Sequence, residues 1–441
     1  MAGSDDKNAV VRYPLSPTQS GMLLRTLMRR NEPVDVEQIV LRLGTKLDHA
    51  TLQKAWGHLV ADEPILRTYM NWRTVGGPFQ EVVESVNHGV KLIELPDNSE
   101  QEITRLSLES RNTPFDIEVA PLARLMHIIC EDCSILVWTL HHILFDGRSY
   151  VLLLDALFRT YRQILAGQIH KVPLYRPFRE FIASLETLDR EAAKSHWQRI
   201  FNEYTPLSSL CQKDLPRSND TETEVAVVKR LSAADTQALV QWSEQHGVTL
   251  VSTLYGLWCT TLSILTGSLD IVFGVTLAGR HVNGEVFDGL GLYINTLPLR
   301  WTGHGNRTFA ETAVDLRKQI LALRPYVQTS LTDIHRWVGI APGYHLFETL
   351  VVYDHQSLET RLNTTHPSFS DCRVEEYGST GFPLTLVAFG SPVLETRVIG
   401  DPSCISQAKA VQVIELLHKL ARAIPRHTPQ PIAQLVGQFA S

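Results

Sequence analysis

Apolar and polar residues recur along the chain with two different periods. Residues 38–43 alternate with a period of two, which predicts a strand with one buried face. Five apolar residues of the next segment follow the three-to-four spacing of a helix: Leu52, Ala55, Trp56, Leu59 and Val60. Helical and strand-like segments mix throughout, and no sequence repeat with a period of about 20–50 residues is present. The pattern therefore predicts an α/β fold (α+β, mixed sheets) and excludes solenoids and propellers.

Capping residues mark where some of these helices begin and end. Ser16 is placed as an N-cap before Pro17, and Gln19 can complete a capping box. In the second half, Thr249 predicts the start of an apolar helix that ends at Gly267.

Two β-rich runs, residues 124–130 and 134–140, are joined by a short acidic turn. This arrangement predicts a β-hairpin. The second run carries His141 and His142 at its end. The hairpin therefore places two imidazoles at the end of its second strand.

A tight turn at Asp146 and Gly147 follows the histidines. We expect Ser149 to cap a long apolar helix after this turn, with its end at Gly167. The turn would let the Asp146 carboxylate fold back and orient the local backbone.

A proline- and charge-containing connection at residues 168–190 is the predicted boundary between two lobes. Weakly patterned, turn-rich stretches at 206–226 and 355–380 predict surface loops. The predicted parts are a disordered arm at residues 1–12, an N-terminal lobe at 13–175 and a C-terminal lobe at 176–441.

Composition narrows the function classes. The 441 residues are 44% hydrophobic and 20% charged, so the chain can bury a sizeable core. The formal charge of 41 − 47 = −6 argues against a nucleic-acid partner. The most apolar stretch, residues 135–145, is short and interrupted by two histidines, and the N-terminus lacks the pattern of a secretory signal. We therefore expect a cytoplasmic protein with no membrane partner.

Six cysteines are spread along the chain, mostly among apolar neighbours. Reduced, partly buried thiols are the expected state in a cytosolic protein. Cys130 and Cys133 form a C-x-x-C pair, but no second pair accompanies it, so we predict no metal site.

The stretch H-H-I-L-F-D-G at residues 141–147 carries the candidate chemistry. Neighbouring residues of a strand point to opposite faces, so His141 and His142 cannot share one role. One ring should be locked into the structure while the other faces a cavity. An imidazole with a pKa near 6.5 suits proton transfer at neutral pH. Two ordinary core histidines would be the alternative explanation of the pair taken alone.

The stretch matches the HHxxxDG motif of the condensation domains of nonribosomal peptide synthetases. Other segments resemble further motifs of this family in the same order, at residues 15–19, 63–68, 114–124, 279–280, 291–300 and 346–353. The resemblance runs from about residue 13 to about residue 390. Residues 20–23, Arg148 and residues 398–401 depart from the common pattern. These departures leave the subtype and the acceptor class open.

The resemblance implies two chloramphenicol-acetyltransferase-like lobes in a V-shaped pseudo-dimer. A tunnel between them would be entered by the phosphopantetheine arms of carrier proteins. The implied reaction transfers a carrier-bound acyl or aminoacyl thioester to an amine, or to a hydroxyl group of a small molecule. No cofactor would be bound permanently. Since neither a carrier nor an adenylation domain is visible in the chain, peptidyl or acyl carrier proteins would dock as separate partners or as neighbouring domains.

The resemblance also assigns roles to residues of the motif. It implies that His142 is the catalytic histidine, as a general base or as a positioning group. His142 or the backbone N–H of Gly147 would stabilise the developing oxyanion. His141 is expected to face inward, and Asp146 is expected to form a structural ion pair with Arg67.

Three residues of the second half complete the implied site. Gly279 and Arg280 would belong to the floor of the tunnel, and Asn295 would lie where the second lobe reaches across it. Three alternatives stay open at this point: a CoA- or carrier-dependent O-acyltransferase of the same superfamily, an epimerisation domain, and a silent module that recruits another enzyme.

Overall fold

The computed structural model describes residues 9–95, 97–168, 175–205, 225–303, 306–341, 344–365, 371–426 and 430–440. The chain divides into two units. The first comprises Met1–Leu188, Gly279–Ile294 and Leu358–Ser379, and the second comprises Asp189–Ala278, Asn295–Ser357 and Thr380–Ser441.

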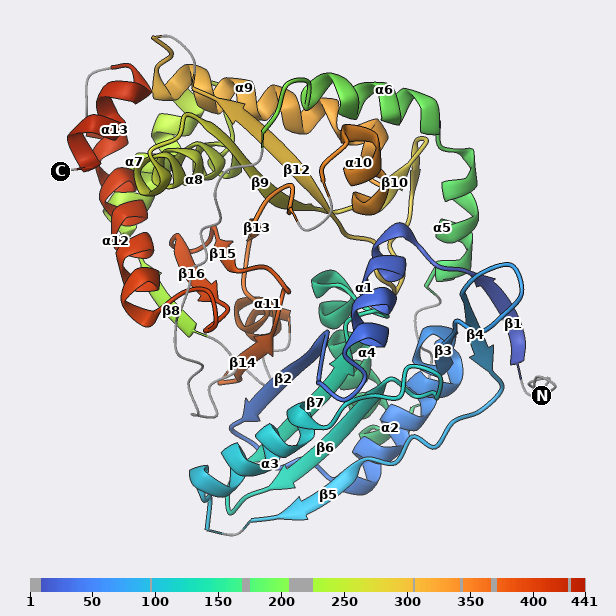
Figure 1. The fold of residues 1–441 in the computed structure, drawn as a ribbon. Helices are drawn as coiled ribbons and strands as arrows, with labels where there is room; N and C mark the ends of the chain where they lie inside the picture. Colours follow the sequence, from blue (N-terminus) through green and yellow to red (C-terminus); the bar gives the residue numbers. More distant parts are fainter. Residues whose placement is uncertain are drawn as a thin grey trace. The chain divides into compact units, whose positions relative to one another are not determined.

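A mixed sheet in the order β14-β2-β7-β6-β5 forms the centre of the first unit (Figure 1). Neighbouring strands are antiparallel except β5 and β6, which are parallel. The strands are β2 (Val36–Leu43), β5 (Lys91–Glu94), β6 (Ala123–Ile129), β7 (Ser134–His141) and β14 (Arg373–Gly378).

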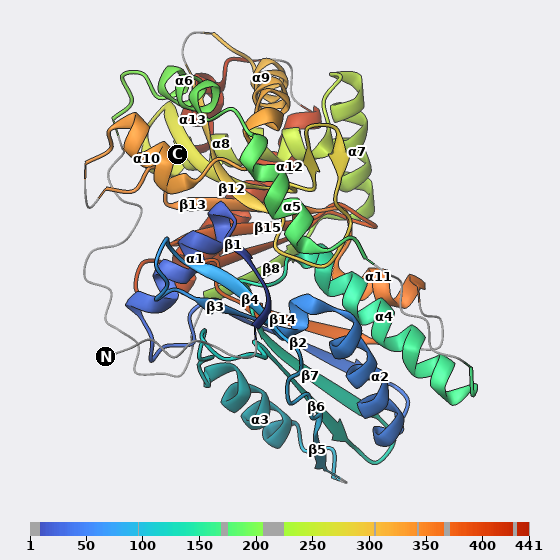
Figure 2. The same ribbon diagram turned by 90° about the vertical axis from the view of Figure 1, so that its right-hand side faces the viewer.

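Helices cover both faces of this sheet (Figure 2). Helix α3 (Glu100–Asn112) packs on one face, whereas α2 (His49–Asp62) and α4 (Gly147–Leu165) pack on the other. Strand β7 is buried at every position, because its side chains meet a helical layer on each side. The continuous apolar run before the histidines therefore follows from the position of β7 at the middle of the sheet.

The remaining elements of the first unit surround this core. Strands β1, β4 and β3 form a small antiparallel sheet in that order, and β10 pairs with β11. The bounds are β1 (Ala9–Pro14), α1 (Pro17–Met28), β3 (Thr68–Asn71), β4 (Phe79–Val83), α5 (Phe178–Ser184), β10 (His281–Val282), β11 (Glu285–Val286) and α11 (Leu358–Thr365).

The second unit is built on a sheet in the order β12-β9-β13-β15-β16-β8. Its strands are β8 (Val225–Arg230), β9 (Asp270–Leu277), β12 (Asn295–Thr302), β13 (Thr349–Asp354), β15 (Leu384–Phe389) and β16 (Glu395–Gly400). Its helices are α6 (Arg190–Ile200), α7 (Ala233–Gln245), α8 (Leu250–Thr266), α9 (Phe309–Ala322), α10 (Leu331–Val338), α12 (Gln407–Ala423) and α13 (Ile432–Ala440). Helices α8, α9 and α12 bury their apolar faces in one core with the sheet.

Within the described residues, no single helix has the length and hydropathy to cross a membrane. Helices α7 and α8 meet both criteria only as a pair, and they are bent by 103° at the break between them.

Several sequence predictions of local structure are confirmed. Ser16 and Gln19 form the capping box of α1, and Thr249 and Gly267 cap the two ends of α8. Strands β6 and β7 form the predicted hairpin. Local signals were sufficient at these positions because each cap involves residues at most four apart in sequence.

Three local predictions are wrong. The N-cap of α4 is Asp146, not Ser149, because the Asp146 carboxylate accepts the Ser149 N–H and starts the helix three residues earlier. Residues 9–12, predicted as part of a disordered arm, belong to β1. The predicted loop at 355–380 contains α11 and β14, whereas most of the other predicted loop, residues 206–224, lies outside the described residues.

The units also differ from the lobes predicted at residues 13–175 and 176–441. The first unit extends to Leu188 and takes up two later segments, 279–294 and 358–379. Strand pairing explains the second of these segments, since β14 forms its ladder with β2. A buried ion pair explains the first, as described below.

Candidate active site

His141 is locked into the interior of the first unit. It is 1% exposed, and its Nε2 lies 3.2 Å from Thr26 Oγ1 on α1. The Ile143 N–H donates to Nδ1 at 3.2 Å, so the ring carries its hydrogen on Nε2. Burial lowers the pKa of His141 to about 3, which keeps the ring neutral. The predicted inward orientation of His141 is confirmed.

The ring of His142 lies on the opposite side of the chain and stays partly open. Its Nδ1 lies 2.6 Å from the carbonyl oxygen of Phe145. A carbonyl only accepts hydrogen bonds, so Nδ1 carries the hydrogen in the neutral ring and Nε2 presents a lone pair. The side chain keeps 16% of its surface exposed. His142 is thus held in the tautomer that a proton acceptor requires.

The Asp146 carboxylate is fully buried at the N-terminus of α4. One oxygen, Oδ1, accepts the Ser149 N–H at 2.9 Å and lies 2.7 Å from the guanidinium of Arg280. The other oxygen accepts the Tyr293 N–H at 3.1 Å. Asp146 thereby ties the turn after His142 to the segment 279–294.

The predicted ion pair of Asp146 with Arg67 is wrong, because Arg280 takes that place. The guanidinium of Arg67 donates instead to four main-chain carbonyls, those of Val60, Ala61, Val83 and Glu84. Two of these carbonyls belong to the last turn of α2, where a cation is favourable. Arg67 therefore stabilises the end of a helix and not the turn after His142.

Arg280 is buried, with 5% of its surface exposed, and Gly279 before it is buried as well. Besides its bond to Asp146, the guanidinium donates to Gly289 O at 2.7 Å and lies 4.0 Å from the centre of the Tyr293 ring. All of these groups belong to the first unit. Arg280 supports the turn of the motif from within that unit.

Gly147 begins α4, and its backbone is exposed. A methyl group added to its Cα would meet no atom within 4 Å. The first N–H groups of a helix lack partners inside the helix and point toward its N-terminal end. Gly147 thus leaves a hydrogen-bond donor and open space at the start of α4, five residues after His142 in the sequence.

Asn295 begins β12 in the second unit and is buried. Its amide nitrogen donates to Val327 O at 2.8 Å and to Thr329 O at 2.7 Å. Both hydrogens of the amide are used in these bonds, so Asn295 holds a loop of its own unit.

A family model described as "Condensation domain" matches residues 11–436. This chain belongs to that family. The match covers nearly the whole chain and includes every site residue named above.

Individual relatives are long proteins of which this condensation domain matches a small part. It is 31% identical to one of the linear gramicidin synthase proteins of Brevibacillus parabrevis, over 97% of this chain but only 9% of that protein. It is 22% identical to surfactin synthase subunit 3 of Bacillus subtilis (strain 168), over 96% of this chain and 34% of that protein.

Solved condensation domains share the fold. The domain from Monacolin K polyketide synthase superposes with a TM-score of 0.79 at 17% identity, covering 97% of this chain and all of that one. The first condensation domain of the calcium-dependent antibiotic synthetase also gives a TM-score of 0.79, at 18% identity, covering 97% of this chain and 99% of that one. The predicted α/β fold with two chloramphenicol-acetyltransferase-like lobes is confirmed.

The opening motif of the condensation domain supports the histidine loop directly. Gln19 Nε2 donates to Ile143 O at 3.0 Å and to Gln80 Oε1 at 3.1 Å. Gln19 is fully buried, so these bonds replace water that the amide would otherwise bind. The motif at residues 15–19 therefore connects α1 with the residue that follows His142.

Glu37 and Tyr150 are site residues that sequence reasoning missed. Glu37 Oε1 lies 3.5 Å from His142 Nε2, and the hydroxyl of Tyr150 donates to Glu37 Oε2. The Tyr150 oxygen also lies 3.1 Å from His142 Nδ1. A carboxylate near the start of the largely apolar strand β2 was the available signal, but the residues that surround it in the fold could not be predicted from the sequence.

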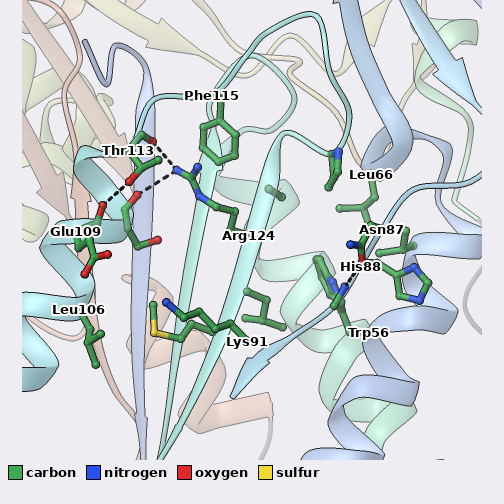
Figure 3. Close-up of a pocket in the computed structure, with 17 residues that line it drawn as sticks. Trp56, Leu66, Asn87, His88, Lys91, Leu106, Glu109, Thr113, Phe115 and Arg124 are labelled. Carbon is green, nitrogen blue, oxygen red and sulfur yellow. Dashed lines mark hydrogen bonds between the residues drawn. The ribbon is translucent and has the colours of Figure 1, made fainter. Parts of the chain in front are cut away.

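A cavity of about 460 Å³ elsewhere in the first unit does not include the histidine motif (Figure 3). Trp56, Leu66, Phe115 and Arg124 are among its lining residues. Arg124 already donates to Ser110 O and Thr113 O at the end of α3, at 3.0 and 2.6 Å. Its charge therefore stabilises a helix C-terminus, and we do not place the active site here.

Proposed function

We propose that this condensation domain forms an amide, by transferring an acyl or aminoacyl group from a carrier-bound thioester to an amine acceptor. The observation that supports the proposal most directly is the tautomer and the exposure of the His142 ring. Its Nδ1–H is committed to Phe145 O, and its Nε2 lone pair lies on a partly open face. A base positioned in this way contributes on the order of 10²–10⁴ in rate.

Acyl transfer also requires a group that stabilises the oxyanion, and the exposed start of α4 can provide one. When the amine attacks the thioester carbonyl, negative charge develops on the carbonyl oxygen. We assign the stabilisation of this oxyanion to the Gly147 N–H or to the protonated imidazole of His142. Asp146, Arg280 and His141 would act indirectly, by holding the turn that carries both groups.

The donor and acceptor are part of the same proposal. Phosphopantetheine arms of peptidyl or acyl carrier proteins would deliver the acyl group, in the cytoplasm, and no cofactor would stay bound. The substrates would pass beside loops that are held in place by Gly279, Arg280 and Asn295, and not beside these residues themselves. Ester formation, epimerisation or a silent recruiting role are the competing functions.

The test incubates the protein with a series of acyl-loaded carrier proteins and with paired amine and alcohol acceptors. Mass spectrometry of the intact carriers follows both loss of the acyl group and formation of product. We expect amide product with the wild type and none with His142→Ala. Ester product alone, a change in stereochemistry without transfer, or equal product from the His142→Ala variant would contradict the proposal.

A further inference from the structure

Two hydrogen-bond acceptors face each other beside the motif. They are His142 Nε2 and Glu37 Oε1, and they lie 3.5 Å apart. The other nitrogen of His142 donates to Phe145 O, and the other oxygen of Glu37 accepts the Tyr150 hydroxyl. With His142 neutral and Glu37 ionised, no hydrogen lies between the two facing atoms.

The fold holds the Glu37 carboxylate in this place. Glu37 pairs with Leu140 in the ladder of β2 and β7, so it shares a face of the sheet with His142, two positions further along. On its other side Glu37 pairs with Gly378 of β14, where a Cβ atom would come within 2.9 Å of Glu37 Cγ. Glycine at this position leaves room for the glutamate side chain.

Tyr150 fixes the direction of the carboxylate. Its ring packs edge-on against Trp138 at 5.8 Å between centres. Burial raises the pKa of Tyr150 well above its ordinary value, so the phenol keeps its hydrogen and donates to Glu37 at neutral pH. Glu37 Oε1 is thereby left for another donor.

Among the described residues, no arginine or lysine forms an ion pair with Glu37. Asp35 is paired with Arg25 at 2.6 Å, and Asp146 is paired with Arg280 at 2.7 Å. On β14, the nearby Glu376 adds negative charge around Tyr150. The site therefore holds two adjacent acceptors, and both side chains keep part of their surface open, 21% for Glu37 and 16% for His142.

We propose that Glu37 binds the ammonium form of the acceptor and selects amines over alcohols. This proposal rests on the acyl transfer proposed above. A primary ammonium group carries a positive charge and three N–H donors, so it can bond to Glu37 Oε1 and His142 Nε2 at once. A hydroxyl group has one hydrogen and no charge, so it leaves one of the two acceptors without a partner.

The protons balance in this arrangement. His142 Nε2 takes one proton from the ammonium group, and the amine lone pair then forms the C–N bond at the thioester carbonyl. The nitrogen passes a second proton to Glu37, the C–S bond breaks, and the leaving thiolate takes the proton of His142. Glu37 then returns its proton to solvent, so the net products are an amide, a thiol and one proton.

The test compares amine acceptors with alcohol acceptors of the same structure, in the wild type and in variants of Glu37. The acceptors are aminoacyl N-acetylcysteamine thioesters and their 2-hydroxyacyl counterparts, and the measured quantity is kcat/KM with the loaded carrier. For Glu37→Gln we expect kcat/KM to fall about 10- to 100-fold with amines, mainly through KM, and to change less than about threefold with alcohols. Glu37→Asp should recover part of the preference. Glu375→Gln removes a charge from β14 at a position paired with Val40 and serves as the control.

Equal losses with both acceptor types would show that Glu37 is only structural and would overturn the proposal. Binding of the same acceptors without a donor, measured by calorimetry, separates this proposal from the proposed function. If the wild type binds amines more tightly than alcohols and Glu37→Gln abolishes the difference, Glu37 binds ammonium even if no amide forms. An unchanged preference in Glu37→Gln would refute the ammonium site, whatever the turnover.

Discussion

At the residue scale, the two neighbouring histidines differ in what their rings can still do. His141 uses both ring nitrogens inside the protein, whereas His142 keeps Nε2 on a partly open face. We therefore expect His142→Ala to lower amide formation by at least about 10²-fold with little change in Tm. His141→Ala should lower the free energy of unfolding by roughly 2 kcal/mol or more, because it leaves the buried Ile143 N–H without an acceptor and removes the Nε2–H that donates to Thr26 Oγ1. Thermal melts and single-turnover assays of the two variants check this contrast, and a fully active His142→Ala would contradict it.

Buried neutral histidines also make the stability depend on pH. Burial lowers the pKa of His141 to about 3 and that of His127 and His418 to about 4, against about 6.5 in an unfolded chain. As the pH falls below about 6.5, these histidines bind protons in the unfolded state but stay neutral in the folded state. The free energy of unfolding should therefore decrease between pH 6.5 and pH 4, by at most about 1.4 kcal/mol per pH unit for each histidine.

Urea unfolding at pH 7 and pH 5 measures this loss. His418→Gln is the informative variant, since an amide can keep the bond that His418 Nε2 makes with Thr396 Oγ1 at 2.7 Å. The pH dependence should be smaller in this variant than in the wild type. An identical dependence in both proteins would mean that His418 does not contribute.

Residue roles could be predicted only as far as local sequence determines them. The opposite orientation of His141 and His142 follows from the two-residue period of a strand, and the structure confirms it. The predicted partner of Asp146, Arg67, was wrong. The actual partner, Arg280, lies 134 positions away in the sequence, and only the tertiary fold brings it close. Glu37 was missed for the same reason, since strand pairing places it beside His142.

At the element scale, the first position of α4 offers a way to test the oxyanion assignment. Proline is tolerated at the first position of a helix, and Asp146 before it already has an extended backbone, with φ −108° and ψ 171°. Gly147→Pro should remove the N–H while the helix stays folded. If that N–H binds the oxyanion, kcat should fall about 10²-fold in Gly147→Pro, whereas Gly147→Ala keeps the donor and the activity. Equal activity of both variants would assign the oxyanion to His142.

The ion pair of Asp146 and Arg280 joins the start of α4 to a segment more than 130 residues later. Removal of either partner leaves a buried charge alone and should cost about 3–5 kcal/mol in the free energy of unfolding. The double variant Asp146→Ala/Arg280→Ala should cost less than the sum of the single losses. A double-mutant cycle from chemical denaturation gives the coupling energy, with Arg67→Ala as the control that should not couple to Asp146→Ala.

Elements with strong local signals were predictable, and elements defined by their neighbours were not. The helix ends at Ser16 and Thr249 carry their own caps, so the sequence was sufficient there. Strand β14 alternates only weakly between partly buried and exposed positions. It becomes a strand because the edge of β2 is available for pairing.

At the scale of the whole molecule, the first unit is assembled from three separate stretches of the chain. A fragment of residues 1–188 lacks both Arg280 and β14, so Asp146 loses its cation and β2 loses a neighbour. We expect this fragment to lack a cooperative thermal transition, although it contains the entire histidine motif. Circular dichroism of the fragment beside the full chain checks this, and a cooperative melt near the Tm of the full chain would contradict it.

The late position of β14 in sequence also has a consequence for synthesis on the ribosome. Glu37 on β2 is translated before β14, and its pairing partner on that strand, Gly378, follows about 340 residues later. At about 5–20 residues per second, this interval lasts on the order of 20–70 seconds. During that time one edge of the growing sheet has no neighbour and can pair with other nascent chains. Slower translation after residue 188 should therefore lower the yield of folded protein more than slower translation before it.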